Sequence, residues 1–274
     1  MKKLLFSTLF LLVAAPVLVF GYGISLDFNK IKDTLSATQN LMIEDNLEQE
    51  IEIGRVISGR LLGAHNLMTD KQLQQYVNKV GRWVASQSER SELQWQFGVI
   101  DADSINAFSA PGGYIFLTKG LYQLLNSEAE LAAVLAHEIG HVVQKHQLKI
   151  LKKSALIHFG RLLVESTLDQ KQSGMAMNNL VGYGAEMLSR GLDKDSEFEA
   201  DKIGVVLTAR AGYNAYALPI VLQEIGHAGM NNQSDVRLMF KTHPHPNDRL
   251  DELAPGMEGF SGDGQMVDDR FYRI

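Results

Sequence analysis

The stretch His137-Glu138-Ile139-Gly140-His141 constrains this chain more than any other, because its residues can act together only on a helix. Residues four apart lie above one another on one helical face, so His137 and His141 can direct a ring nitrogen at the same metal ion. Glu138 is offset from both, where its carboxylate can take a proton from a water molecule that the metal activates. The pattern predicts a metal-dependent hydrolase that cleaves amide bonds.

The residues around this motif favour a helix packed in the core. Ser127 followed by Glu130 is typical of an N-cap with a capping box. An apolar stripe of helical period follows, formed by Leu131, Val134, Leu135, Ile139 and Val142. The alternative is that both histidines are buried only for packing, which would leave two polar rings without local partners in an aliphatic helix. We therefore favour metal binding.

A catalytic zinc site has three protein ligands, so a third ligand must come from elsewhere in the chain. Ser196 is a candidate N-cap for a helix that ends near Gly212. On that helix Glu197 and Asp201 lie one turn apart on one face, so Glu197 is the candidate ligand. Asp201 is then placed to accept the outer N–H of a metal-bound histidine. The alternative is a solvated acidic helix start that the helix dipole stabilises.

Four blocks of the sequence resemble one known family. They are His137 to His141, Glu197 with Asp201, the run Asn106-Ala107-Phe108-Ser109-Ala110-Pro111-Gly112-Gly113, and His243-Pro244 with Arg249. Across Glu44 to Leu253 the chain resembles the gluzincin zinc metallopeptidases of the CAAX prenyl protease, HtpX and BepA/LoiP type. The resemblance implies a metalloendopeptidase that holds one Zn²⁺ per chain.

The resemblance also implies a role for each matching residue. It assigns His137, His141 and Glu197 as zinc ligands, Glu138 and His243 as catalytic residues, Asp201 and Arg249 as supporting residues, and Asn106, Ala107 and Phe108 as the substrate-binding strand edge. The rigid loop His243-Pro244-His245-Pro246 can bring one imidazole to the metal or to the oxyanion of peptide hydrolysis. His243 then stabilises the transition state, blocks the metal as an extra ligand, or does both. Arg249 either pairs with a carboxylate near the site, anchors the loop, or lies on the surface.

The expected fold is α+β and mainly α, a zincin-like domain with a small β-sheet whose edge strand lies beside the zinc helix. Leu93–Ile100, Ala107–Ser109 and Tyr114–Leu117 have strand patterns around a Pro-Gly-Gly turn. Helices are expected at Glu44–Leu62 and Asp70–Ser86. The resemblance implies that an exposed strand edge beside the metal accepts substrate as an added strand, and main-chain pairing of this kind has weak sequence preference.

Other histidines are not expected to bind metal. Gln223-Glu224-Ile225-Gly226-His227 echoes the zinc motif, but glutamine replaces its first histidine. His227 is therefore predicted to be a cap or surface histidine, and the same is predicted for His65, His146 and His158.

The N-terminus is typical of a bacterial signal peptide. Two lysines precede an apolar run from Leu4 to Phe20, which predicts a signal peptide at 1–23, a linker at 24–43 and a single metallopeptidase domain at 44–274. A retained membrane anchor is the alternative, because the run is only slightly shorter than a spanning helix. The chain has no cysteine, which excludes a lipoprotein anchor and disulfides. We expect the soluble periplasmic branch of the family, without a tetratricopeptide tail.

The expected substrates are misfolded or stalled envelope proteins, with outer-membrane assembly machinery as a possible partner, and this expectation rests on the resemblance. The net charge of −6 without a basic cluster argues against nucleic acid. The segment 148–192 is interpreted as a packed helical hairpin, or alternatively as a lid or membrane-contacting element. A rival function is a chaperone-like quality-control factor, latched by His243, that binds clients with little proteolysis.

Overall fold

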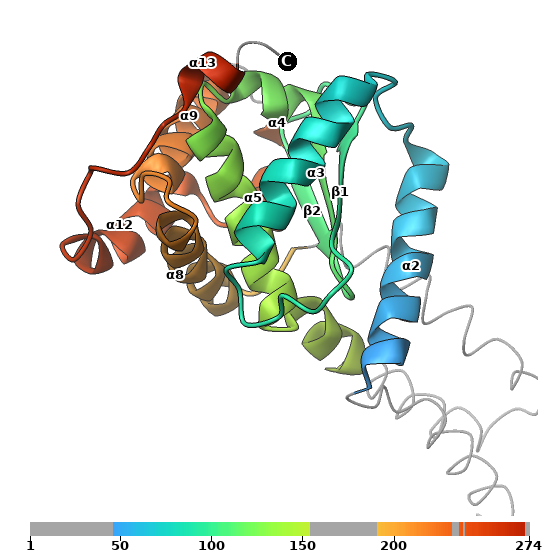
Figure 1. The fold of residues 1–274 in the computed structure, drawn as a ribbon. Helices are drawn as coiled ribbons and strands as arrows, with labels where there is room; N and C mark the ends of the chain where they lie inside the picture. The colour runs from blue at the N-terminus through green and yellow to red at the C-terminus, as the bar shows by residue number, and fades with distance from the viewer. Residues whose placement is uncertain (1–45, 154–190, 232–235, 238, 272–274) are drawn as a thin grey trace, which may run out of the picture. The chain divides into compact units, whose positions relative to one another are not determined.

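The computed structural model describes residues 46–153, 191–231, 236–237 and 239–271 (Figure 1). Contacts divide the chain into units of residues 1–40 and 41–274, and every described residue lies in the second unit. The predicted signal peptide, most of the 148–192 segment and His158 therefore lie outside the described residues. Among the helices that the structure describes, none has the length and apolar character needed to cross a bilayer.

The described part of the chain is mainly helical with one small sheet. In chain order its elements are α2 (Leu47–Ala64), α3 (Lys71–Ala85), β1 (Gln96–Ile100), β2 (Ala107–Ala110), β3 (Tyr114–Thr118), α4 (Lys119–Leu124), α5 (Glu128–Val143), α8 (Lys194–Arg210), α9 (Ala217–Asn231), α11 (Met239–Thr242), α12 (Pro246–Met257) and α13 (Asp268–Phe271). The α+β, mainly α prediction is confirmed. The two expected helices before the sheet and its three expected strands are present, with small shifts at their ends.

The sheet has the strand order β1-β3-β2, with β1 parallel and β2 antiparallel to the central strand β3. Two amide side chains of α3 cover the outer edge of β1. The side chain of Gln74 bonds both the N–H and the C=O of Val99, each at 2.9 Å. Asn78 does the same for Phe97. These amides take the place of a further strand, so this edge is closed to another chain.

The outer edge of β2 is the second edge of the sheet. Thr118 donates its backbone N–H to the carbonyl of Asn106 at 3.0 Å, and Phe108 is in register with Phe116. Because hydrogen-bonded and non-bonded pairs alternate in an antiparallel ladder, Ala107 and Ser109 direct their backbone groups away from β3. Within the described part of the chain no further strand pairs with this edge, so its N–H and C=O groups are placed to accept an added strand.

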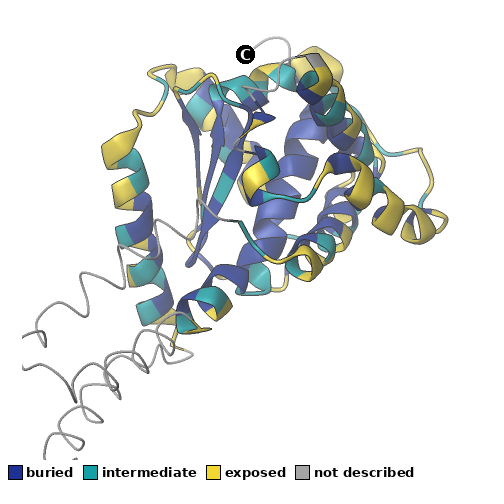
Figure 2. Cartoon of the chain, turned by 180° about the vertical axis from the view of Figure 1, so that it is seen from behind, coloured by how far each residue is buried: buried dark blue, intermediate teal, exposed yellow. Residues whose placement is uncertain are grey.

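Helix α5 carries the predicted metal motif and lies among the other helices and the sheet (Figure 1). Figure 2 shows that the centre of the described part is buried. Ser127 is the N-cap, and its Oγ accepts a hydrogen bond from the backbone N–H of Glu130 at 3.2 Å, as predicted. The carboxylate of Glu130 accepts from the backbone N–H of Asn126 at 2.8 Å, one residue before the N–H used in a regular capping box. Every residue from Glu128 to Val142 is buried. The histidines of the motif therefore sit in a helix that is held on all sides.

Helix α8 packs against α5 at a short distance, and two glycines allow this approach. A Cβ atom at Gly204 would lie 3.1 Å from the backbone nitrogen of His137, and one at Gly140 would lie 3.2 Å from the carbonyl oxygen of Ala200. The crossing brings the first turns of α8, with Glu197 and Asp201, against the two histidines of α5.

The prediction that Ser196 caps α8 is wrong. Asp193 is the N-cap, and its side chain accepts a hydrogen bond from the backbone N–H of Ser196 at 2.9 Å. An Asp side chain caps as well as Ser, and here the cap lies three residues before the predicted one. The predicted stop is close to the observed one, because α8 ends at Arg210 and Gly212 has a positive φ of 89°.

Candidate metal centre and active site

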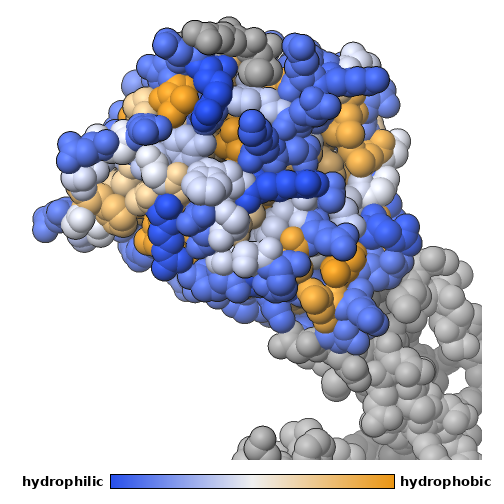
Figure 3. Space-filling view, in the orientation of Figure 1, coloured by the Kyte–Doolittle hydropathy of each residue, from blue (hydrophilic) through white to orange (hydrophobic). Residues whose placement is uncertain are grey.

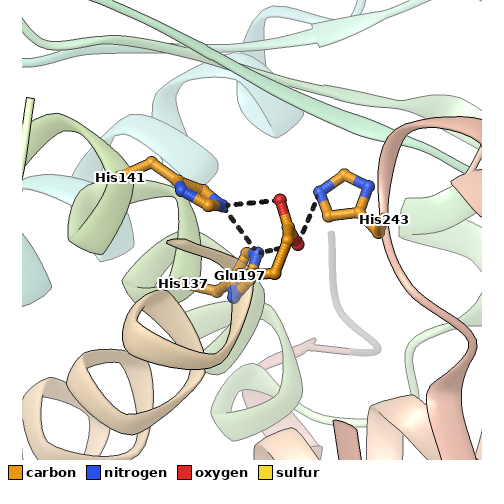
Figure 4. A group of neighbouring side chains, drawn as sticks. All are labelled: His137, His141, Glu197 and His243. Atoms are coloured by element: carbon orange, nitrogen blue, oxygen red, sulfur yellow. Dashed lines mark hydrogen bonds and ion pairs between the residues drawn. The ribbon is translucent and has the colours of Figure 1, made fainter. Parts of the chain in front are cut away.

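Four side chains from three parts of the chain converge at one point (Figure 4). His137 and His141 come from α5, Glu197 from the first turn of α8, and His243 from the loop between α11 and α12. One donor atom of each lies within 4.8 Å of the others. The two histidine Nε2 atoms are 3.1 Å apart, and that of His141 is 3.4 Å from Glu197 Oε1. The structure thus brings together all three predicted ligands and adds His243.

The carboxylate of Glu197 shows that this group fits a cation. Its side chain is fully buried, and neither oxygen accepts a hydrogen bond from the described residues. Burial raises the pKa of Glu197 to about 8. A buried carboxylate without hydrogen bonds is unfavourable unless a positive charge lies beside it. Two imidazoles and a carboxylate with one position left over are the ligand set of a catalytic zinc site.

The outer nitrogen of His137 is held by the predicted supporting residues. Nδ1 lies 2.8 Å from Asp201 Oδ1, and Arg249 Nε donates to Asp201 Oδ2 at 2.8 Å. Burial alone would raise the pKa of Asp201, but the adjacent guanidinium outweighs it and holds that pKa well below its usual range. The carboxylate therefore stays charged and orients the ring. Arg249 was predicted to pair with a carboxylate near the site, to anchor the loop or to lie on the surface. In the structure it is buried and pairs with Asp201.

Among the described residues, the candidate base Glu138 accepts a side-chain hydrogen bond through its Oε2. Ser109 on β2 lies with its Oγ 2.6 Å from Glu138 Oε2, and Gln147 donates to that Oγ at 2.7 Å. The serine hydroxyl therefore donates its proton to the carboxylate, since its oxygen already accepts from the amide. The other oxygen, Oε1, lies 3.9 Å from His243 Nε2. Burial raises the pKa of Glu138. Sequence reasoning missed Ser109, because strand and helix meet only in the folded chain.

His243 rather than His245 faces the site. Its backbone N–H bonds the carbonyl of Met239 at 2.8 Å, and its Nε2 lies 3.7 Å from Glu197 Oε2. His245 is exposed and caps α12, accepting from Asn247 N at 3.3 Å. The choice between these two histidines made from motif position therefore agrees with the geometry.

The prediction that His146 is a cap or surface histidine is wrong. Its ring is 1% exposed, and its Nδ1 lies 2.9 Å from Nδ1 of His141. Helix α5 ends at Val143, and Lys145 has a positive φ of 55°, which turns the chain back toward the site. The left-handed conformation is uncommon for lysine, so the local sequence does not predict this turn. His65 and His227 are exposed, as predicted.

An apolar pocket that is partly open to solvent adjoins this group. Its lining includes Glu138, Glu197 and His243, together with the apolar residues Ile57, Ala107, Phe108, Ile150, Leu151 and Leu192. Two of the predicted substrate-edge residues, Ala107 and Phe108, therefore lie at the pocket. The third, Asn106, does not line it. Asn106 is fully buried, with its backbone paired to Thr118.

Comparisons with known proteins agree with this geometry. The profile of peptidase family M48 matches residues 71–255. The beta-barrel assembly-enhancing protease of Escherichia coli K12 is 30% identical over 212 residues, which are 75% of this chain and 43% of that protein. Its namesake in Yersinia pestis is 28% identical over 214 residues, covering 76% of this chain and 43% of the relative. The mitochondrial metalloendopeptidase OMA1 of Arabidopsis thaliana is 29% identical over 189 residues, which are 69% of this chain and 37% of that protein.

The chain spans less than half the length of these relatives, so their names describe longer proteins. The family match is independent of that difference, because it covers 71–255 of 274 residues and contains the convergent residues of α5, α8 and the α11–α12 loop. The chain therefore belongs to peptidase family M48, whose members are metal-dependent peptidases.

Proposed function

We propose that this chain is a zinc-dependent endopeptidase of the bacterial cell envelope that cleaves misfolded or stalled proteins. The observation that carries the proposal is the convergence of His137, His141 and Glu197, with the carboxylate of Glu138 at the edge of the same group. The residues of this group fit Zn²⁺, as the buried and unbonded oxygens of Glu197 indicate.

A cation held by these three residues would polarise the scissile carbonyl and increase the acidity of water. Glu138 Oε1 takes the proton of the attacking water and returns it to the amide nitrogen of the leaving group. Oε2 stays bonded to Ser109, so the carboxylate keeps one orientation through both transfers. His243, whose Nε2 lies 3.9 Å from Oε1, is positioned to stabilise the oxyanion when its ring donates a proton.

The substrate edge and the pocket support unfolded protein as the substrate class. The backbone groups of Ala107 and Ser109 that point away from β3 bind an extended chain without regard to its sequence. The apolar lining of the pocket beside Phe108 favours an apolar side chain. Folded proteins bury such side chains and pair their backbones, so an extended and apolar segment is available mainly in a misfolded client.

The location and partners are inferred from the N-terminal sequence and from the relatives. The lysines and apolar run before residue 23 support export to the periplasm, with a single N-terminal anchor as the alternative. Relatives named beta-barrel assembly-enhancing proteases support a link to outer-membrane assembly machinery. The acidic net charge supports partners other than nucleic acid. For the segment 148–192, membrane contact is the alternative to a packed helical hairpin.

The test is degradation of casein by the purified chain, with zinc content measured for each preparation. We expect wild type to cleave casein and to stop on chelation, and Glu138→Gln to hold zinc without cleaving. A Glu138→Gln variant that cleaves as fast as wild type would show that another group acts as the base. The exposed Glu92→Gln is the matched control and should cleave at the wild-type rate.

A second candidate function is a latched, chaperone-like factor that binds clients with little proteolysis. The observation that favours it is the position of His243, whose Nε2 shares the ligand group at 3.7 Å from Glu197 Oε2. There it would occupy the position that substrate needs. If the wild-type chain binds zinc and casein without cleaving casein, and the His243→Ala variant does cleave it, His243 is a latch on a peptidase. If neither the wild-type chain nor His243→Ala cleaves casein, the result supports a chaperone-like factor that only binds clients.

A further inference from the structure

A second histidine lies directly behind the candidate ligand His141. The ring of His146 is buried, its Nδ1 is 2.9 Å from His141 Nδ1, and its Nε2 is 3.2 Å from Oε2 of Glu199. Glu199 is half exposed and lies on α8, two residues beyond Glu197. The three side chains thus form a continuous line from solvent to the centre of the site. The proposed chemistry does not use His146 or Glu199.

The direction of the hydrogen bonds along this line follows from the role of His141. Its Nε2 faces the ligand group, so this nitrogen must keep its lone pair free and Nδ1 must carry the proton. Two ring nitrogens 2.9 Å apart share a hydrogen bond only if one has a proton and the other does not. Nδ1 of His146 is therefore the acceptor, its Nε2 carries the proton, and that proton is donated to Glu199.

We propose that His146, anchored by Glu199, is a positioning residue that fixes the ring orientation and tautomer of His141 for metal binding. His137 has the corresponding support from Asp201, at 2.8 Å from its Nδ1. A ligand imidazole whose outer N–H has an acceptor is oriented and is more basic toward the metal. The proposal rests on the proposed function, since it requires that His141 bind the ion.

The turn after α5 explains how this contact arises. The chain turns at Lys145, which has a positive φ, and a helical stretch begins at His146; both His146 and Gln147 are buried. His146 is directed at the ligand His141, and Gln147 at Ser109, which bonds the base. One local turn therefore supports a ligand on one side and the base on the other.

The test is the Zn²⁺ dissociation constant of the purified full chain, measured by competition with a chromophoric chelator. We expect His146→Leu, which has similar volume but no acceptor, to bind Zn²⁺ about 10–100-fold more weakly than wild type. Asn is smaller than His, but its amide oxygen would lie where Nδ1 of His146 lies and can accept the same hydrogen bond. We therefore expect the Zn²⁺ affinity of His146→Asn, on a logarithmic scale, to be at least halfway from that of His146→Leu to that of wild type. Glu199→Gln keeps an acceptor without charge and should weaken binding less than ten-fold. The exposed His227→Ala is the control and should match wild type.

The comparison of Leu with Asn separates positioning from packing. A residue that only filled space would be replaced better by Leu, so Asn binding no tighter than Leu would overturn the proposal. Equal affinity of His146→Leu and wild type would do the same. If His146→Leu does not fold, the decision falls to His146→Ala, which also lacks the acceptor, and wild-type Zn²⁺ affinity in that variant would overturn the proposal. A wild-type chain that binds no Zn²⁺ would overturn the proposed function itself, which is a distinct result.

Discussion

Asp201 Oδ1 lies 2.8 Å from Nδ1 of His137, so a carboxylate one turn beyond the proposed ligand Glu197 holds the ring of the first histidine. The same carboxylate receives the buried guanidinium of Arg249. Asp201 therefore links α8, α5 and α12 at the candidate site. Its negative charge is maintained by Arg249 and is directed at the metal position through the imidazole.

Asp201→Asn should weaken Zn²⁺ binding about 10–100-fold and lower the stability of the metal-free chain by about 3–5 kcal/mol. The amide lacks the charge that orients His137, and it leaves the cation of Arg249 buried without a counter-ion. Chelator competition and urea unfolding measure the two effects. Asp248→Asn is the control, because Asp248 forms an exposed ion pair with Lys194 at 3.0 Å. Equal Zn²⁺ affinity in both variants would contradict the role of Asp201.

Ser109→Ala should lower kcat about ten-fold while zinc content and KM stay close to wild type. The alanine removes the 2.6 Å hydrogen bond to Glu138 Oε2, so the base loses its fixed orientation but the ligands are untouched. Steady-state cleavage of a fluorogenic peptide separates kcat from KM. The exposed Ser91→Ala serves as the reference. A change confined to KM would mean that Ser109 contacts substrate rather than positioning the base.

A peptide substrate should depend on alternate backbone N–H groups. Ala107 and Ser109 present an edge of β2 that no other strand among the described residues pairs with, whereas Gln74 and Asn78 close the edge of β1. N-methylation of a substrate amide that pairs with the β2 edge should raise KM about five-fold, the value of one hydrogen bond. Methylation of the next amide along should change KM little. A series of singly methylated peptides tests this, and a uniform response along the series would argue against strand addition.

Glu128→Gln should make stability less dependent on pH. The buried Glu128 accepts hydrogen bonds from Tyr76 and Tyr213, each at 2.7 Å, and pairs with Arg270 of α13. Burial acts to raise its pKa, but these partners outweigh burial and hold the pKa below its usual value. An acid whose pKa is lowered by folding stabilises the fold above its unfolded pKa, near 4.3, and this contribution is lost as pH falls below that value.

Chemical unfolding of wild type and Glu128→Gln between about pH 7 and pH 3 measures this effect. We expect the variant to be about 1–3 kcal/mol less stable at pH 7, with the difference shrinking below about pH 4. Glu92→Gln, at an exposed position, should follow the wild-type curve. Curves for Glu128→Gln and wild type that stay parallel down to pH 3 would show that the charge of Glu128 does not stabilise the fold.

The face of the molecule drawn in Figure 3 does not suggest a site that selects substrate side chains. On the face seen in Figure 3, hydrophobic side chains are scattered among polar ones. Isolated apolar side chains of this kind are normal on a protein surface and do not mark a binding site. The apolar lining of the pocket beside Glu138 and Phe108 is therefore the feature to which we attribute side-chain preference.

The sequence alone determined those features that depend on short-range spacing. The four-residue separation of His137 and His141, the N-cap at Ser127 and the strand patterns each describe one element, and the structure contains the helix, its cap and the three strands. Hydrogen bonds and side-chain periodicity within an element depend on neighbouring residues, so they can be recognised without the fold. The pairing of α5 with α8 was inferred from a resemblance to a family rather than from spacing.

Only the tertiary structure decided which side chains support the site. Ser109 meets Glu138 across 29 residues of sequence and Gln147 meets Ser109 across 38, and neither pair has a local pattern. His146 is close to His141 in sequence, but the left-handed turn at Lys145 rather than residue spacing directs it inward. The N-cap of α8 is Asp193 rather than the predicted Ser196, and residue type alone does not separate the two, because both types cap well. Such contacts depend on how helices and strands pack in three dimensions, and a one-dimensional pattern does not contain that information.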